Sequence, residues 1–84
     1  MYFMFNERTF FSKKIGIIIK EKRIKDKKIT LGQLADQCDI DPKTLWRIEE
    51  GHVTASSFNL LKIFYLLDIQ TSEYLKILLQ EETK

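Results

Sequence analysis

Residues 30–51 read Thr-Leu-Gly-Gln-Leu-Ala-Asp-Gln-Cys-Asp-Ile-Asp-Pro-Lys-Thr-Leu-Trp-Arg-Ile-Glu-Glu-Gly and contain two helix-start signals eleven residues apart. Thr30 and Gln33 form a capping box, in which the hydroxyl accepts a hydrogen bond from the backbone N–H three residues on and the amide reaches back. Asp41 before Pro42 is the second start, because Asp caps helices and Pro at the first helical position loses no hydrogen bond.

These signals predict two short helices, over residues 30–37 and 42–50, joined by a tight turn at Asp39-Ile40. Gly51 can take the left-handed conformation that ends a helix. Two short helices joined in this way form a helix-turn-helix, whose second helix can enter the major groove of DNA. DNA binding is therefore the leading hypothesis.

Composition sets the class of the molecule. The chain has 84 residues, enough for one domain, and is 44% hydrophobic and 31% charged, which is typical of a globular protein. Three Gly and one Pro favour helices over a turn-rich β fold. A single Cys excludes a disulfide framework and fits a reducing cytoplasm, and with a single His it gives no zinc site. We expect no metal and no cofactor.

Charge is distributed unevenly along the chain. From Arg8 to Lys28, nine Lys and Arg face two acidic residues, a net of +7. From Ile29 onward five basic residues face nine acidic ones, a net of −4, and Glu7 completes the formal +2. A basic first third suits a face directed toward phosphates, although a solvated helix gives the same pattern.

Residues 1–11 form an aromatic N-terminal arm that holds five of the ten aromatic residues: Tyr2, Phe3, Phe5, Phe10 and Phe11. Asn6-Glu7-Arg8 interrupts it, so we do not expect a signal peptide, and no run approaches the roughly 18 apolar residues of a membrane span. The arm should fold back on its own domain or cover a partner, either as a short strand or as an extension of the first helix.

Apolar periodicity predicts three further helices within a single domain over residues 12–80, followed by a tail at 81–84. The first covers residues 12–27, with Ile17 and Ile24 off its apolar stripe, either exposed or in contact with the arm. A second, from Ser56 or Ser57 to Leu67, is apolar on nearly all sides, as is typical of a helix central to a core. The last runs from Thr71 or Ser72 to about Gln80.

The following residues together resemble the Cro/C1-type (XRE) helix-turn-helix family: Ile15-Gly16, Ile19-Lys20, Arg23, Ile29-Thr30, Leu34-Ala35, Ile40, Leu45, Ile48-Glu49, Gly51, Leu60, Ile63, Leu67 and Ile69. The resemblance covers residues 15–69 in order and without gaps. It implies an all-α, five-helix lambda-repressor-like domain that binds double-stranded DNA as a dimer and regulates transcription, usually as a repressor. The terminal additions are also similar to restriction-modification controller proteins.

Carried onto this chain, the resemblance gives the base-reading role to Lys43, Thr44 and Arg47, with Trp46 as a further candidate. Arg47 suits guanine best, because its guanidinium can donate two parallel hydrogen bonds to O6 and N7. An exposed Trp46 can instead mark a protein contact.

The resemblance also implies contacts that position the protein on the phosphate backbone. These fall at the start of the helix over 30–37, through Thr30 and Gln33, and in the loop that follows residue 50, through His52 and Thr54. Arg23 and Glu49 occupy the positions of an ion pair between the first and third helices.

The expected homodimer surface comprises Tyr74, Leu75 and Leu78, because the acidic, apolar end of the chain is remote in charge from phosphates. A protein-binding module on the same fold, such as an antitoxin or accessory subunit, is the alternative, docking through Trp46 and the aromatic arm. Acidic residues around the third helix favour it, whereas Lys43 and Arg47 favour DNA. With one His and no Gly-rich phosphate loop, we do not expect an enzyme.

Overall fold

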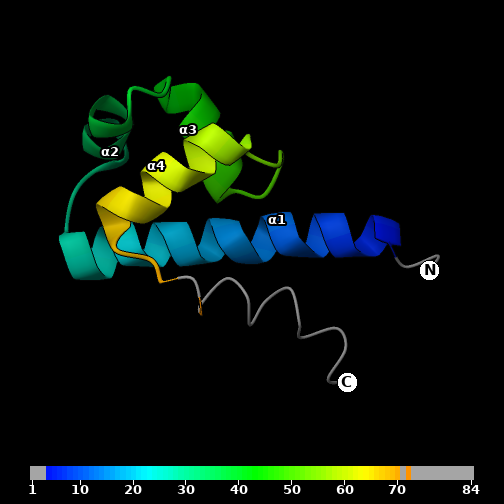
Figure 1. The fold of residues 1–84 in the computed structure, drawn as a ribbon. Helices are drawn as coiled ribbons and strands as arrows, with labels where there is room; N and C mark the ends of the chain where they lie inside the picture. Colours follow the sequence, from blue (N-terminus) through cyan, green and yellow to red (C-terminus); the bar gives the residue numbers. More distant parts are fainter. Residues whose placement is uncertain (1–3, 71, 73–84) are drawn as a thin grey trace.

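A computed structural model describes residues 4–70 and 72, with side chains from Phe10 onward. The elements are α1 (Met4–Glu21), a π-helical turn η1 (Lys22–Lys27), α2 (Leu31–Cys38), α3 (Pro42–Glu49) and α4 (Ser57–Leu67). The long helix α1 forms a base, and α2, α3 and α4 lie together on one side of it (Figure 1). The described residues contain no strand, which confirms the all-α class.

The first helix is displaced from its predicted range of residues 12–27. It begins at Met4, so the arm, over residues 4–11, is an extension of α1 rather than a separate segment. Phe10 and Phe11 are partly buried against the core. At the other end the helix widens into η1, and Lys28 closes it in a left-handed conformation (φ 55°), donating its N–H to the carbonyl of Arg23.

The helix-turn-helix segment matches its prediction closely. The Thr30 hydroxyl accepts from the Gln33 N–H at 3.1 Å, and the Gln33 Oε1 accepts from the Thr30 N–H at 2.8 Å, so the capping box is complete. The Asp41 carboxylate accepts from the backbone N–H of Lys43 at 3.0 Å. Asp39 takes a left-handed conformation (φ 57°) in the turn between the two helices.

One hydrophobic core joins all four α-helices. Its fully buried members include Ile19 from α1, Leu34 from α2, Leu45 from α3, and Ile63 from α4. Burying each such side chain contributes about 1.5–3 kcal/mol of transfer free energy.

The apolar circumference of α4 is not buried on all sides, contrary to expectation. Ile63, Phe64 and Leu67 face the core, whereas Phe58, Leu61 and Tyr65 are exposed on the opposite side. In the described part of the chain α1, α2 and η1 pack against α4, and this packing leaves these three side chains uncovered. The two outlying residues of the first helix, Ile17 and Ile24, are likewise half-exposed.

The predicted fifth helix, from residue 71 or 72 to 80, and the tail at 81–84 lie outside the described residues, apart from Ser72. Four α-helices are therefore established, and the fifth remains a prediction. Within the described chain, no helix combines the length and the apolar character that crossing a membrane requires.

Gly16 allows α1 and α3 to approach closely. A Cβ at this position would lie 2.6 Å from the backbone oxygen of Ile48 and closer still to that of Glu49. Because backbone atoms of a packed helix cannot move aside cheaply, only Gly fits here.

We expect Gly16→Ala to lower the free energy of unfolding by about 3 kcal/mol, the upper part of the range for overpacking. Gly32→Ala is the control, since its added Cβ meets only the Thr30 Oγ1 at 3.9 Å and Ala favours a helix. Urea denaturation measures the free energy of unfolding of both variants, provided that their m-values equal that of the wild type. Equal stabilities of the two variants would contradict the close approach.

The thiol of Cys38 is 1% exposed, and burial raises its pKa above the ordinary value of 9.0, although Lys62 partly offsets this. We expect a thiol reagent at pH 8 to react at least about 100-fold more slowly with the folded chain than in urea, because reaction requires opening of the fold. Because the Cys38 thiol ionises at a lower pH in the unfolded chain than in the folded chain, the free energy of unfolding should have its full value below pH 9.0. It should fall as the pH rises above 9.0. Rapid labelling of folded protein would contradict this burial.

Candidate nucleic-acid interface

The outward face of α3 carries four exposed polar or aromatic side chains, Lys43, Thr44, Trp46 and Arg47. The opposite face is locked in the core, where Leu45 is 0% exposed. The four predicted base-reading residues are thus brought together on one short helix, and none of them is needed to fill the core.

Trp46 is 46% exposed and contacts the loop that follows α3. The His52 ring meets the Trp46 ring edge to face, with centroids 5.3 Å apart and an interplanar angle of 86°. The backbone N–H of His52 also donates to the carbonyl of Arg47 at 2.9 Å. Sequence spacing did not predict this contact, which places His52 beside the exposed face of α3.

At the start of α2, both predicted phosphate residues are exposed and both take part in the capping box. The box uses the oxygens of Thr30 and Gln33 as acceptors. A hydroxyl and an amide each also carry N–H or O–H donors, so the same side chains can donate to a phosphate oxygen. The helix amides at this end point in the same direction.

Thr54 has a structural role that the sequence did not indicate. Its hydroxyl lies 2.6 Å from the hydroxyl of Ser12, which belongs to α1 and is buried. This hydrogen bond ties the loop after α3 to the base helix. Gly51 supports the same attachment, because its left-handed conformation (φ 77°) brings its backbone against Lys13.

Arg23 and Glu49 form the expected ion pair between the first helical segment and α3. The guanidinium donates to Glu49 through Nε at 2.8 Å and through a terminal nitrogen at 3.1 Å, and a further N–H donates to the carbonyl of Ile29 at 3.0 Å. The side chains are 9% and 2% exposed. The pair therefore orients the inner side of α3 and leaves the outer side of this helix exposed to solvent.

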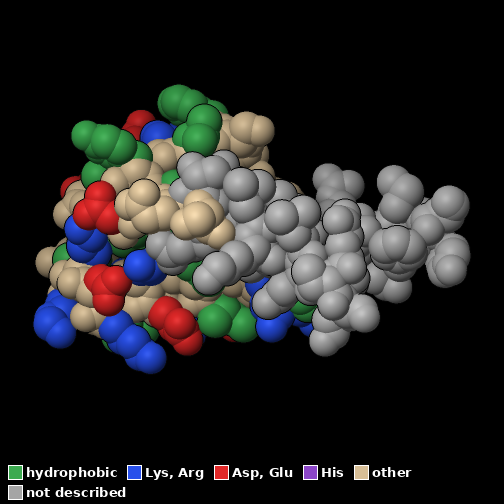
Figure 2. Space-filling view, turned by 60° about the horizontal axis from the view of Figure 1, so that its bottom comes forward, with side chains coloured by type: hydrophobic (Ala, Val, Ile, Leu, Met, Phe, Trp, Pro, Cys, Tyr) green, Lys and Arg blue, Asp and Glu red, His purple; other side chains and the backbone are tan. Residues whose placement is uncertain are grey.

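Part of the positive charge in the first third of the chain is compensated in three dimensions. Lys20 pairs with Glu50, Lys22 with Asp26, and Lys27 with Asp68. At the end of the molecule where α1 passes into η1, on the left of Figures 1 and 2, Lys and Arg side chains alternate with Asp and Glu. This end is a mixed-charge surface, and the lysine run does not by itself make a phosphate-binding stripe.

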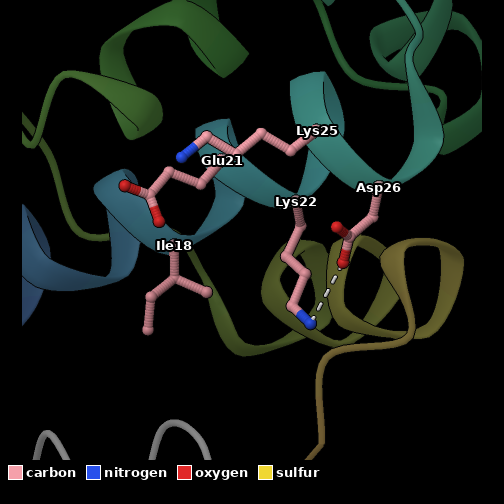
Figure 3. A pocket seen from close by; sticks show the side chains of 5 residues that line it. All are labelled: Ile18, Glu21, Lys22, Lys25 and Asp26. Carbon is pink, nitrogen blue, oxygen red and sulfur yellow. Dashed lines mark ion pairs between the residues drawn. The ribbon is translucent and has the colours of Figure 1, made fainter.

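A shallow hollow on this mixed-charge surface has a volume of about 240 Å³. Ile18, Glu21 and Lys25 line it together with the Lys22–Asp26 ion pair, whose charged atoms are 3.3 Å apart (Figure 3). It is lined by two acidic and two basic side chains, so it offers no uniform field to an anion or a cation.

The turn between α2 and α3 is acidic. A second hollow of about 300 Å³ opens here, lined by Gly32, Ala35, Asp36, Asp39, Ile40, Asp41 and Pro42. Its three carboxylates lie beside the proposed DNA face, where they repel phosphates. In the part of the chain that the structure describes, no group of three or more acidic, His or Cys residues is suited to hold a metal ion.

The predicted dimer residues Tyr74, Leu75 and Leu78 lie outside the described residues. Comparison of the chain with models of protein families, with curated proteins and with solved structures found no match.

Replacing Glu49 with Gln should lower the free energy of unfolding by about 3–5 kcal/mol, because the buried Arg23 charge loses its counter-charge. The double variant Arg23→Met/Glu49→Leu should recover much of this loss, since apolar side chains of similar volume need no desolvation. Urea denaturation of the three chains measures the coupling. A loss below about 1 kcal/mol in Glu49→Gln would mean that the pair behaves as an exposed one.

Proposed function

We propose that this chain is a cytoplasmic, sequence-specific DNA-binding regulator of the Cro/C1 helix-turn-helix type, with α3 in the major groove. The observation that supports it best is the arrangement of α3. Lys43, Thr44, Trp46 and Arg47 share its exposed face, while Leu45 and Glu49 fix its other face in the core. A dimeric repressor and a five-helix lambda-repressor-like fold belong to the same proposal.

Each side chain on this face has a chemical role in reading a base pair. Arg47 donates two hydrogen bonds to guanine O6 and N7, which discriminate by about 1–3 kcal/mol. Lys43 donates to guanine or to a phosphate, and the Thr44 hydroxyl can donate or accept. Trp46 offers an apolar edge to a thymine methyl group or a sugar, with its ring oriented by His52.

Positioning contacts come from the start of α2 and from His52. Thr30, Gln33 and the first amides of α2 point toward one phosphate, and His52 lies at the other side of α3. Thr54 is a weaker candidate, because its hydroxyl already holds the loop against Ser12.

A protein-binding module is the second candidate, and a specific observation favours it. Asp36, Asp39 and Asp41 line the hollow at the turn before α3, and Trp46 on α3 is half-exposed. Exposed Trp is enriched at protein interfaces, and carboxylates there oppose DNA. On this reading Trp46 would anchor a basic partner.

Selection from a random duplex library at about 100 mM salt separates the two candidates, because specific contacts must compete with salt-dependent phosphate binding. Purified, folded protein should enrich one motif, with two half-sites one helical turn apart if it binds as a dimer. Enrichment of no motif would reject the DNA proposal and leave the protein-binding module.

Arg47→Ala should relax the preference at one guanine position of that motif by about 1–3 kcal/mol without unfolding the chain. Lys14→Ala is the control, because it removes one positive charge from an exposed position on α1 and should leave the base preference intact. Trp46 is the only Trp, so its fluorescence reports binding directly at the proposed interface. Unchanged preference in Arg47→Ala would remove Arg47 from the reading surface.

A further inference from the structure

The loop between α3 and α4, residues 50–56, is attached to α1 at two neighbouring points. The Thr54 hydroxyl lies 2.6 Å from the hydroxyl of Ser12, whose side chain is buried. The Gly51 backbone packs against the next residue of α1, so closely that a Cβ at Gly51 would lie 2.9 Å from the Lys13 Cα. The segment between the two attachments is therefore held close to α1.

His52 lies between these attachments and contacts Trp46. Its backbone N–H donates to the Arg47 carbonyl at 2.9 Å, and its ring meets the Trp46 ring edge to face, with 5.3 Å between centroids. Trp46 is 46% exposed, so core packing covers only part of it. Edge-to-face contact is a favoured arrangement of aromatic rings, and here it restricts the rotamers of an exposed indole. The position of His52 therefore helps to set the orientation of Trp46.

A continuous series of contacts thus connects the buried side of α1 with the outward face of α3. The Ser12 hydroxyl holds Thr54, and His52 lies two residues earlier in the same loop. The His52 ring then contacts Trp46. An apolar side chain in the major groove distinguishes thymine by contact with its methyl group, so the orientation of the indole decides whether it can make that distinction.

We propose that Ser12 is a positioning residue for DNA reading, which acts through the loop to orient Trp46 toward a thymine methyl group. Ser12 is buried on α1 and its hydroxyl is bonded to Thr54, so it acts without touching DNA. The effect on DNA rests on the proposed function, whereas the orientation of Trp46 is measurable in the free protein.

The orientation of Trp46 can be followed without DNA. Trp46 is the only Trp, so the tryptophan band of the near-UV circular dichroism spectrum reports how firmly its ring is held. Ser12→Ala should weaken this band at unchanged far-UV signal, because the loop is released while the helices stay packed. Thr54→Ser keeps the hydroxyl and should retain the band. Ser57→Ala, the same substitution at an exposed position of α4, should also retain it.

A double variant separates positioning of Trp46 from general stabilisation of the loop. His52→Ala should weaken the tryptophan band by about as much as Ser12→Ala does. Ser12→Ala/His52→Ala should weaken it no further than His52→Ala alone, because both changes interrupt the same series of contacts. Additive losses in the double variant, or a band that Ser12→Ala leaves unchanged, would overturn the proposal.

Selection from the random duplex library tests the effect on reading. Ser12→Ala should lower the preference for thymine at one position of the motif by on the order of 10-fold and keep the preference at the guanine read by Arg47. A uniform loss of affinity at all positions, or an unchanged motif, would overturn the role in reading. A wild type that enriches no motif rejects the DNA-binding function instead, and circular dichroism of the variants still decides whether Ser12 orients Trp46.

Discussion

The buried ion pair between Arg23 and Glu49 is the interaction on which the arrangement of the helices depends. Arg23 is held at both ends: its guanidinium meets Glu49 and the Ile29 carbonyl, and its own carbonyl accepts from the N–H groups of Lys28 and Ile29. One residue therefore fixes η1, the entry to α2 and the inner side of α3. A misplaced α3 would leave a charge buried without its partner, so the pair specifies orientation rather than adding much net stability.

Much of the fold could be predicted from local sequence. The caps at Thr30 and Asp41 were recognisable because capping is settled by residues within three positions of one another. The Arg23–Glu49 pair came from the family resemblance, since no spacing rule joins residues 26 positions apart. The role of Gly16 was missed for the same reason, because it depends on which backbone lies across from it.

The prediction for α4 was wrong because apolar character along a sequence does not show what surrounds each side chain. The pattern of α4 correctly predicted a helix but not that Phe58 and Tyr65 would remain outside the core, because periodicity does not say whether a covering partner belongs to the same chain. The lysine run was similarly ambiguous. Three of its lysines pair with Asp26, Glu50 and Asp68, and two of these three partners are distant in sequence.

The two faces of α3 have different roles, and the candidate site lies on the face that does not pack in the core. Core packing and the contact with Gly16 act on one side of the helix, so Lys43, Thr44 and Arg47 on the other side can be replaced without disturbing the fold. A scaffold of this kind permits changes of binding preference at little cost in stability. The same difference between two faces holds in α4, whose inner face completes the core while Phe58, Leu61 and Tyr65 remain exposed on its outer face, so neither exposed surface is tied to the packing that holds the helices together.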